Sequence, residues 1–208
     1  MTKKITIKTI IIGDSFSGKT SILNKYINKN FNNIFMATIG VDFYKSIIIR
    51  NNNEYKMTIW DTSGQEKFNS IINSYYRNIG VVIIVFDLTY YNSFLNIKNW
   101  LENLELYDSD NLIKIVVGNK CDLINQRKVG YRDAKEFCND NNMSYIESSA
   151  KENINIENIF INLVDIIEDK ITNCEYMNKN IKIVDEFEVQ EIPKIKLTKN
   201  KKKCCKIS

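Results

Sequence analysis

Apolar residues along this chain follow two alternating spacings, one typical of buried strands and the other of amphipathic helices. Segments rich in apolar residues predict buried strands over residues 5–12, 81–86 and 112–117, and residues 144–147 predict a further short strand. The run over residues 81–86 is continuous and β-branched, as expected of a central strand buried on both faces. Apolar residues three and four apart predict helices between them, over residues 22–27, 94–104, 131–139 and 156–167. Strands that alternate with helices in this way form a mainly parallel sheet with helices on both faces.

Two further strands interrupt the alternation. Residues 41–49 and 55–60 are strand-like and flank the turn Asn51-Asn52-Asn53, so they predict an antiparallel hairpin. The predicted fold class is therefore α/β, a doubly wound sheet of six strands that is mostly parallel, with one antiparallel edge strand. Ligands of such sheets bind outside the carboxyl ends of the parallel strands.

The periodic pattern stops near residue 172. We expect one folded domain over residues 1–172 and a flexible tail over residues 173–208, which is rich in Lys, Asn and Glu and holds the single proline, Pro193. The first segment carries 20 basic and 20 acidic residues and the tail carries 9 and 5, so the net charge of +4 lies entirely in the tail. A basic tail on a neutral body indicates contact with an anionic surface, either a membrane or a nucleic acid.

The composition of the chain excludes several classes of protein and of catalytic mechanism. No run approaches the ~18 apolar residues that span a bilayer, and the N-terminus resembles a strand more than a signal peptide, so we expect a cytosolic protein. The five cysteines show no paired or metal-ligating spacing, as expected in a reducing compartment. Histidine is absent, which excludes an imidazole base and a histidine-bound zinc.

The segment after the first strand carries the strongest chemical signal. Residues 13–20 read Gly-Asp-Ser-Phe-Ser-Gly-Lys-Thr between a strand and a helix, which is the context of a phosphate-binding loop (P-loop). Backbone N–H groups and the positive end of the helix can surround a polyphosphate, and Gly18 lets the main chain come close. Lys19 adds a charge on the β and γ phosphates, and the Thr20 hydroxyl can bind Mg²⁺. A glycine-bearing turn with a chance lysine is the alternative.

Three other motifs follow strands further along the chain. Residues 61–64, Asp-Thr-Ser-Gly, offer a carboxylate to the metal and an N–H to a γ-phosphate. In residues 119–122, Asn-Lys-Cys-Asp, the carboxylate of Asp122 can accept hydrogen bonds from N1–H and the 2-amino group, which guanine has and adenine lacks. Residues 149–151, Ser-Ala-Lys, can complete the base pocket through the N–H of Ala150.

This ordered set of motifs resembles the Ras superfamily of small GTPases from residue 5 to about residue 172. The resemblance implies the fold of a P-loop NTPase. Features similar to the Rab family are residues 38–43, 60–68 and 75–77 and the terminal Cys204-Cys205. Residues 37–39, 59–60 and 99–101 are further similar to the Rab subgroup of the endoplasmic reticulum and lipid droplets.

The resemblance implies a GTP hydrolase with Mg²⁺ as cofactor and GTP or GDP as its bound nucleotide. Gln65 would orient the attacking water, Phe31 would cover the guanine edge, and Asp61 would join Thr20 and Thr38 at the metal. The implied nucleotide-binding residues are Ser15, Ser17, Gly18, Lys19, Thr20, Ser21, Phe31, Thr38, Gly64, Asn119, Lys120, Asp122, Ser149, Ala150 and Lys151.

The resemblance also implies a switch. Thr38 and Gly64 would contact the γ-phosphate and its metal, so the loops around residues 31–44 and 62–78 would order with GTP and relax with GDP. No built-in arginine finger is evident, so turnover would be slow without an activating protein. The residues that would present the ordered state to effectors are Phe43, Trp60 and Tyr75.

Two residues depart from the family pattern. Phe16 stands where a small residue is usual, and Ser63 stands where alanine is usual. They raise a second candidate function, a GTP-binding scaffold with impaired hydrolysis that recruits effectors. A third candidate, an adenine-nucleotide enzyme such as a small kinase, is disfavoured by Asp122.

The chain ends in Lys-Lys-Lys-Cys-Cys-Lys-Ile-Ser. Cys204 and Cys205 beside a polybasic patch predict prenylation. Two prenyl groups, or one prenyl group beside such a patch, anchor a protein stably to a bilayer. Rab-like endings imply two geranylgeranyl groups, whereas residues 205–208 also fit a single farnesylation. A solvated basic tail that touches nucleic acid is the remaining alternative.

The family resemblance implies partners and a location. We expect an exchange factor, a GTPase-activating protein, a dissociation inhibitor or escort protein, and effectors, together with a membrane reached through prenyl groups. We expect a monomer that binds no nucleic acid. The protein would divide between a cytosolic pool and the cytoplasmic face of an intracellular membrane, the endoplasmic reticulum or Golgi.

Overall fold

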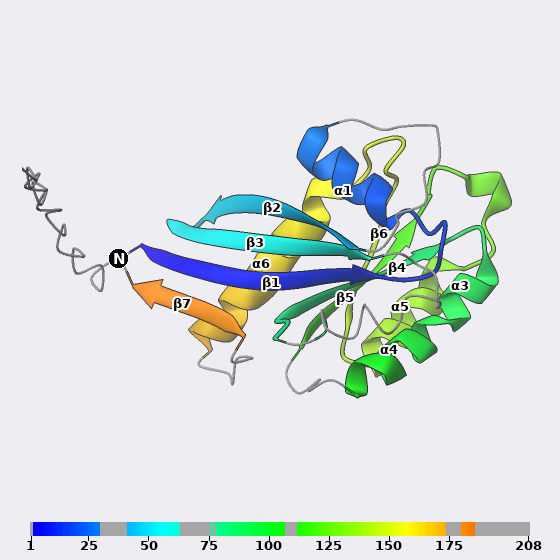
Figure 1. The fold of residues 1–208 in the computed structure, drawn as a ribbon. Helices are drawn as coiled ribbons and strands as arrows, with labels where there is room; N and C mark the ends of the chain where they lie inside the picture. The colour runs from blue at the N-terminus through cyan, green and yellow to red at the C-terminus, as the bar shows by residue number, and fades with distance from the viewer. Residues whose placement is uncertain are drawn as a thin grey trace, which may run out of the picture.

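The computed structural model describes residues 2–29, 41–62, 76, 78–106, 112–173 and 180–185. Within these ranges the chain forms a seven-stranded sheet with helices on both faces (Figure 1). The strands are β1 (Lys3–Ile12), β2 (Val41–Arg50), β3 (Asn53–Thr62), β4 (Val81–Asp87), β5 (Ile113–Asn119), β6 (Ser144–Glu147) and β7 (Ile181–Asp185). The α-helices are α1 (Lys19–Asn28), α3 (Tyr91–Leu95), α4 (Ile97–Glu105), α5 (Tyr131–Asp140) and α6 (Ile156–Thr172).

The strand order is β2-β3-β1-β4-β5-β6, which confirms the predicted mostly parallel α/β sheet. Neighbours from β3 to β6 pair in parallel, and β2 pairs antiparallel with β3 from Val41↔Thr62 to Arg50↔Asn53. The hairpin turn holds Asn51 and Asn52 at φ 46° and 63°, a left-handed conformation that asparagine tolerates better than most residues. The predicted hairpin is therefore confirmed.

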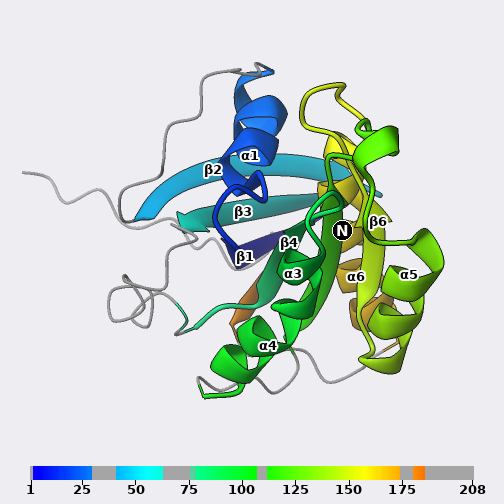
Figure 2. The ribbon, with the colours of Figure 1, turned by 90° about the vertical axis from the view of Figure 1, so that its right-hand side faces the viewer.

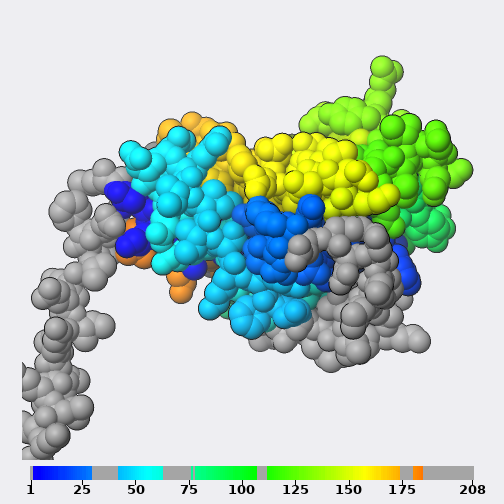
Figure 3. Space-filling view, turned by 90° about the horizontal axis from the view of Figure 1, so that it is seen from above, coloured from blue at the N-terminus to red at the C-terminus, as the bar shows by residue number. Residues whose placement is uncertain are grey.

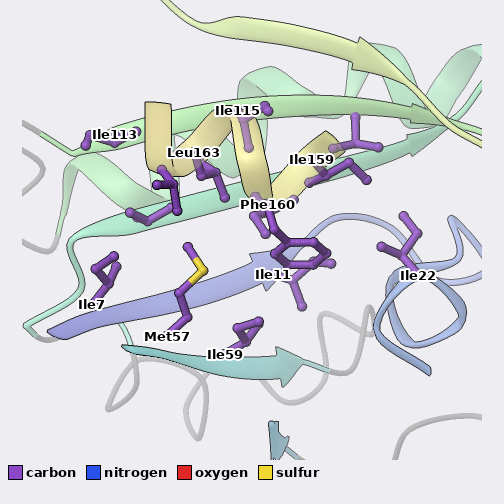
Figure 4. Close-up of a cluster of buried hydrophobic side chains, with 14 of the residues drawn as sticks. Ile7, Ile11, Ile22, Met57, Ile59, Ile113, Ile115, Ile159, Phe160 and Leu163 are labelled. Carbon is purple, nitrogen blue, oxygen red and sulfur yellow. The ribbon is translucent and has the colours of Figure 1, made fainter. Parts of the chain in front are cut away.

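The helices lie in two layers. α1 and α6 cover one face of the sheet, whereas α4 and α5 cover the other (Figure 2). Because successive strand residues point to opposite faces, Ile11 joins the cluster under α1 and α6 while Ile10 and Ile12 join the other. Figure 4 shows Phe160 and Leu163 of α6 directed at the isoleucines of β1 and β5. This two-sided burial explains the uninterrupted apolar run of β4 and the largely apolar sequences of β1 and β5.

The β2–β3 hairpin is held against the C-terminal half of α6. The Arg50 side chain forms an ion pair with Asp165 at 2.9 Å, and Asn51 Nδ2 donates to Glu168 at 2.7 Å. In the space-filling view the cyan hairpin lies against the yellow helix (Figure 3). These contacts fix the end of the sheet that lies away from the P-loop.

Two features differ from the expectations from sequence. The predicted helix over residues 94–104 is divided at Asn96 into α3 and α4. The sheet also has a seventh strand, β7, which pairs antiparallel with β1 and lies within the segment that we expected to be a flexible tail. The division of the chain at residue 172 otherwise stays a prediction. Among the described residues, no helix has the length and apolar character needed to cross a bilayer.

Candidate functional site

The P-loop follows β1 and begins α1. Gly13 and Gly18 have φ values of 134° and 97°, which side-chain-bearing residues rarely adopt. A Cβ atom at Gly18 would lie 2.2 Å from Asn119 Nδ2, and one at Gly13 would lie 2.0 Å from the Val85 carbonyl oxygen. Both glycines are therefore required by backbone conformation and by close neighbours, which accounts for their place in the motif.

Lys19 lies inside the loop. Its ammonium donates to the carbonyl oxygens of Gly13 at 2.7 Å and Asp14 at 2.9 Å. Burial lowers the pKa of Lys19 to about 8, against the opposing effect of the Asp61 and Asp14 charges. A buried cation surrounded mainly by backbone is suited to an anionic ligand, because a phosphate would offset the cost of desolvating the ammonium.

The remaining P-loop residues of the prediction lie around this lysine. Ser17 is buried, Ser15 and Ser21 are half-buried, and α1 starts directly after Gly18. Phe16 adopts φ 66° with its side chain 63% exposed, so the ring lies at the surface of the loop and not in the core. The loop therefore holds Phe16, a residue with a bulky side chain, in a left-handed backbone conformation that such residues rarely adopt.

Thr20 and Asp61 join two motifs that are 41 residues apart. The Thr20 hydroxyl donates to Asp61 Oδ2 at 2.6 Å, while Asp61 Oδ1 is buried and has no hydrogen-bond partner among the described residues. Burial raises the pKa of Asp61 to about 6, although the Thr20 hydrogen bond and the Lys19 charge lower it. A buried carboxylate with an unsatisfied oxygen beside a hydroxyl fits a hard divalent cation such as Mg²⁺.

The described residues do not supply a complete metal cage. They contain no group of three or more Cys, Asp or Glu side chains that could hold a metal ion without other ligands. Mg²⁺ ordinarily takes one or two protein oxygens, together with phosphate and water. The pair of Thr20 and Asp61 is consistent with that donor set.

Asn119 connects three of the four predicted motifs. Its Nδ2 group donates to the Ser17 carbonyl oxygen at 2.8 Å, and its Oδ1 lies 3.4 Å from both the Ser148 hydroxyl and the Ala150 N–H. The residue is 2% exposed. One amide side chain at the end of β5 therefore ties the P-loop to the loop after β6.

Lys120 is held by a residue that the sequence analysis missed. Its ammonium lies 2.6 Å from Asp87 Oδ2, and Asp87 Oδ1 accepts from the Thr89 N–H and hydroxyl at 2.8 and 2.7 Å. Lys120 has a φ of 65°, so this ion pair accompanies a left-handed backbone. Asp87 ends β4, and the rule that pointed to Asp61 and Asn119, a polar residue at the carboxyl end of a strand, could have found it.

Asp122 lies in the same loop and is half-buried. No described residue donates a hydrogen bond to its carboxylate, whereas its backbone carbonyl accepts from Ile124. An acceptor-only group that is partly withdrawn from water and not satisfied by the protein is suited to a ligand with two adjacent donors.

The loop after β6 forms the other side of the predicted base pocket. Ser149 is fully buried, and its hydroxyl accepts from the Glu152 N–H at 3.0 Å, so it shapes the turn. Ala150 is buried, and among the described residues its N–H makes a single long contact, to Asn119 Oδ1 at 3.4 Å. Lys151 is exposed and lies 3.8 Å from the Glu152 carboxylate. The structure thus brings Ala150 beside Asn119 and leaves the Lys151 side chain exposed to solvent.

An ion pair that the sequence did not reveal connects the two loops predicted to bind the base, the loop after β5 (residues 119–122) and the loop after β6 (residues 149–151). Arg127 donates to both carboxylate oxygens of Glu147, at 2.7 and 2.6 Å, and the Tyr145 hydroxyl donates to the same carboxylate at 2.9 Å. The partners are 28% and 16% exposed. Because Arg127 follows residues 119–122 and Glu147 precedes residues 149–151, this pair fixes one loop relative to the other.

A second missed contact holds the P-loop against the helical layer. Asp14 accepts from Trp100 Nε1 at 2.9 Å and from Asn96 Nδ2 at 2.7 Å. Trp100 lies on α4, and Asn96 is the residue between α3 and α4. The aspartate of the loop thus has a structural role, which motif spacing alone does not disclose.

The two described members of the predicted effector group are neighbours. Phe43 and Trp60 pair across β2 and β3, and their ring centroids are 5.7 Å apart. Phe43 is 53% exposed, and the ammonium groups of Lys45 and Lys8 lie over the Phe43 and Trp60 rings, respectively. The exposed Phe43 and the half-buried Trp60 therefore form a partly exposed aromatic patch at the end of the hairpin that lies near the P-loop.

Comparison with known proteins identifies the family. The model of the Ras family matches residues 8–169. The chain is 37% identical to Ras-related protein Rab-3D of Homo sapiens over 174 residues, which are 84% of this chain and 77% of the relative. It is 40% identical to Ras-related protein Rab-1 of Theileria annulata over 166 residues, 79% and 76% of the two chains. It is 36% identical to GTP-binding protein ypt1 of Schizosaccharomyces pombe over 175 residues, 84% and 86% of the two chains.

The chain belongs to the Rab family of Ras-like small GTPases. As a Rab GTPase it is a GTP hydrolase that functions in membrane trafficking. This confirms the family resemblance drawn from the motifs. The resemblance to the Rab subgroup of the endoplasmic reticulum and lipid droplets stays a prediction.

Several predicted residues of this Rab GTPase lie outside the described residues. They are Phe31, Thr38, Ser63, Gly64, Gln65, Tyr75, Cys204 and Cys205. Asp61 and Thr62, which precede Ser63, are described at the end of β3, and the Thr62 hydroxyl donates to the Ile11 carbonyl oxygen at 2.8 Å. The start of this segment is therefore anchored beside the P-loop.

Proposed function

We propose that this Rab GTPase alternates between a GTP-bound active state and a GDP-bound inactive state in order to regulate vesicle traffic. The observation that carries the proposal is the 2.6 Å contact between Thr20 and Asp61. It joins the P-loop to Asp61, which lies two residues before Ser63 and four residues before Gln65 in the chain. A change at the terminal phosphate can therefore act on the segment that follows Asp61.

The phosphates would be bound by the P-loop. Lys19 would exchange its two carbonyl contacts for the β and γ phosphates, and the backbone N–H groups at the start of α1 would add further donors. Thr20, Asp61 and Thr38 would hold Mg²⁺, which when bound neutralises charge on the phosphates. Asp61 supports this assignment, because one of its carboxylate oxygens has no hydrogen-bond partner among the described residues and its pKa is raised by burial, so a bound cation would stabilise its charged form.

Hydrolysis would proceed by in-line attack of water on the γ-phosphorus. The bond between that phosphorus and the bridging oxygen breaks, and GDP and phosphate are released. Gln65 would position the water and Lys19 would neutralise developing charge, so that the protein contributes orientation and electrostatics. Slow turnover without an activating protein would follow from the lack of a recognisable arginine finger in the sequence.

Guanine would be selected by Asp122. The brace of Arg127 and Glu147 holds the loop after Asp122 against β6, and Asn119 keeps the base loops in register with the P-loop. Phe31 would cover the base, and Ala150 would donate to the guanine carbonyl. A base without the two donors would leave the partly buried Asp122 carboxylate unpaired, which is a strong ground for discrimination.

The nucleotide state would be read by effectors through Phe43, Trp60 and Tyr75. The partly exposed aromatic patch of Phe43 and Trp60 supports this role, because aromatic residues are enriched at recognition sites. An exchange factor, an activating protein and a dissociation inhibitor or escort protein would act on the same cycle.

The tail would anchor the protein to the cytoplasmic face of an intracellular membrane, for which we favour the endoplasmic reticulum or Golgi. Cys204 and Cys205 would carry the prenyl groups, and the lysines before them would attract anionic lipid. Mass spectrometry of protein isolated from its host distinguishes two geranylgeranyl groups from a single farnesyl group. An unmodified tail would contradict the proposed anchor.

Base selection is tested by displacement of a fluorescent GDP from the purified protein. We expect GDP to compete at least about 100-fold better than ADP, and we expect Asp122→Ala to remove most of that preference, because two hydrogen bonds to a charged group are lost. Asp140→Ala, an exposed carboxylate at the end of α5, is the matched control. Equal competition by GDP and ADP in the wild type would refute the guanine assignment.

The switch is tested by single-turnover hydrolysis. We expect wild-type protein to consume GTP slowly and Gln65→Ala to be at least about tenfold slower. The double variant Phe16→Gly, Ser63→Ala addresses the scaffold alternative, which neither the comparisons nor the described residues favour. A large gain in turnover by that variant would support the scaffold alternative, whereas an unchanged rate would contradict it.

A further inference from the structure

The tail returns to the sheet as β7. Five residue pairs join it antiparallel to the first half of β1, from Ile181↔Ile7 to Asp185↔Lys3. β3 occupies the other edge of β1, and β4 pairs only with Thr9–Ile12. β7 therefore fills the part of the β1 edge that β4 leaves open, and Figure 1 shows it in orange with its end beside the N-terminus.

The seat for β7 is built from residues of the domain. Ile181 is 7% exposed and belongs to the larger hydrophobic core, and Asn180 Nδ2 donates to the Ile79 carbonyl oxygen at 3.0 Å. A Cβ atom at Gly80 would lie 2.6 Å from Ile181 Cγ1. Glycine at position 80 thus leaves the space that Ile181 occupies.

The hold on β7 is limited. Ile183 and Val184 are 39% and 42% exposed, and Lys182 is also exposed, so Ile181 is the one deeply buried side chain among residues 181–184. Backbone pairing and one buried isoleucine must offset the entropy of ordering the segment. A strand held in this way can dock and release without unfolding the domain.

Docking decides where the tail leaves the domain. Asp185 pairs with Lys3, whereas the P-loop follows Ile12 at the other end of β1, about 30 Å away at ~3.3 Å per strand residue. With β7 docked, the 18 residues 186–203 separate the sheet from Cys204; with β7 released, the 31 residues 173–203 separate α6 from Cys204.

We propose that residues 180–185 form a docking strand that sets the base and the length of the membrane tether. The proposal rests on the proposed prenylation of Cys204 and Cys205. The docked strand starts the tether at the end of the sheet opposite the P-loop and the aromatic patch of Phe43 and Trp60. It also holds the domain closer to an anionic bilayer than a free tail would.

The docking step is tested by amide hydrogen exchange of the full chain bound to GDP. We expect residues 181–185 to be protected, and we expect Ile181→Asp to raise their exchange at least about tenfold, because the buried side chain is replaced by a charge. Val184→Asp places the same charge on the exposed face of the strand and is the matched control. Gly80→Ala fills the seat without altering the tail and should act like Ile181→Asp.

The consequence is tested by neutron reflectometry of prenylated protein on a supported bilayer of phosphatidylcholine with one-fifth phosphatidylserine. For tethers that follow flexible-chain statistics, release of β7 by Ile181→Asp or Gly80→Ala should raise the mean height of the domain by roughly 7 Å. The wild type and Val184→Asp should give equal heights.

The outcomes separate the two proposals. Unprotected residues 181–185 in the wild type, or equal heights for all variants, would overturn the docking strand and leave the anchor intact. A wild-type protein whose bilayer binding does not require its prenyl groups would overturn the proposed anchor, and the tether proposal with it, whatever the exchange data show.

Discussion

Replacing Asn119 with alanine removes the side chain that connects the P-loop to both base loops. The 2.8 Å hydrogen bond from Nδ2 to the Ser17 carbonyl oxygen is the strongest of its contacts, and it lies at a site only 2% exposed. Loss of one buried hydrogen bond, with the partner left unsatisfied, costs about 1–3 kcal/mol. The two contacts at 3.4 Å are long and should add little.

The loss should appear in nucleotide binding, because the contact positions two loops that grip the same ligand. At 1.4 kcal/mol per tenfold change, we expect the Kd for GDP to rise by about 5- to 150-fold in Asn119→Ala. The increase should lie mainly in the dissociation rate, measured by the release of a fluorescent GDP in the presence of excess unlabelled GDP.

Two variants separate this linking role from general destabilisation. Ser148→Ala removes only a 3.4 Å contact and should change the dissociation rate by less than about threefold. Asn119→Asp keeps the shape but places an oxygen opposite the Ser17 carbonyl, so it should be at least as damaging as alanine. GDP dissociation from Asn119→Ala at the wild-type rate would show that the Asn119 link does not support binding.

Other expectations concern stability and ionisation. Arg127→Ala leaves the Glu147 carboxylate without its ion-pair partner and should lower the free energy of unfolding in urea by about 2 kcal/mol, less than for a fully buried pair. Arg50→Ala, at an exposed ion pair, should lower it by under ~0.5 kcal/mol. Equal losses for the two variants would contradict the role of the Arg127–Glu147 pair. Burial raises the pKa of the Cys138 thiol to about 12. Iodoacetamide at pH 8 should therefore label Cys138 about a thousandfold more slowly in native than in urea-unfolded protein, as measured by peptide mass spectrometry. Similar labelling rates in the two states would contradict the burial of this thiol. Burial lowers the pKa of Lys19 to about 8, and an anionic ligand raises it, so nucleotide-free protein should take up about 0.7 proton on binding GDP at pH 8.5. Calorimetry in two buffers of different ionisation enthalpy measures this uptake, and proton release would refute the sign.

The local elements and the order of the motifs could be predicted from the sequence. Residues 81–86 contain no polar residue because β4 is covered on both faces, and this burial can be inferred from the residue types alone. Asp61 and Asn119 could be assigned to one edge of the sheet because each ends a strand in the predicted alternation. The glycines of the P-loop were likewise predictable, since backbone conformation restricts residue choice locally.

The pairings between distant residues could not be predicted in this way. Asn119 meets Ser17 across 102 positions, and Lys120 meets Asp87 across 33, through side-chain geometry that leaves no periodic trace. β7 was hidden for a different reason. Residues 181–184 contribute one deeply buried isoleucine within a lysine- and asparagine-rich segment, and what makes the segment a strand is the open edge of β1 beside Gly80. Sequence therefore determined which segments could be buried, whereas the tertiary structure decided which partners they met, because complementarity between distant surfaces is not a property of either segment alone.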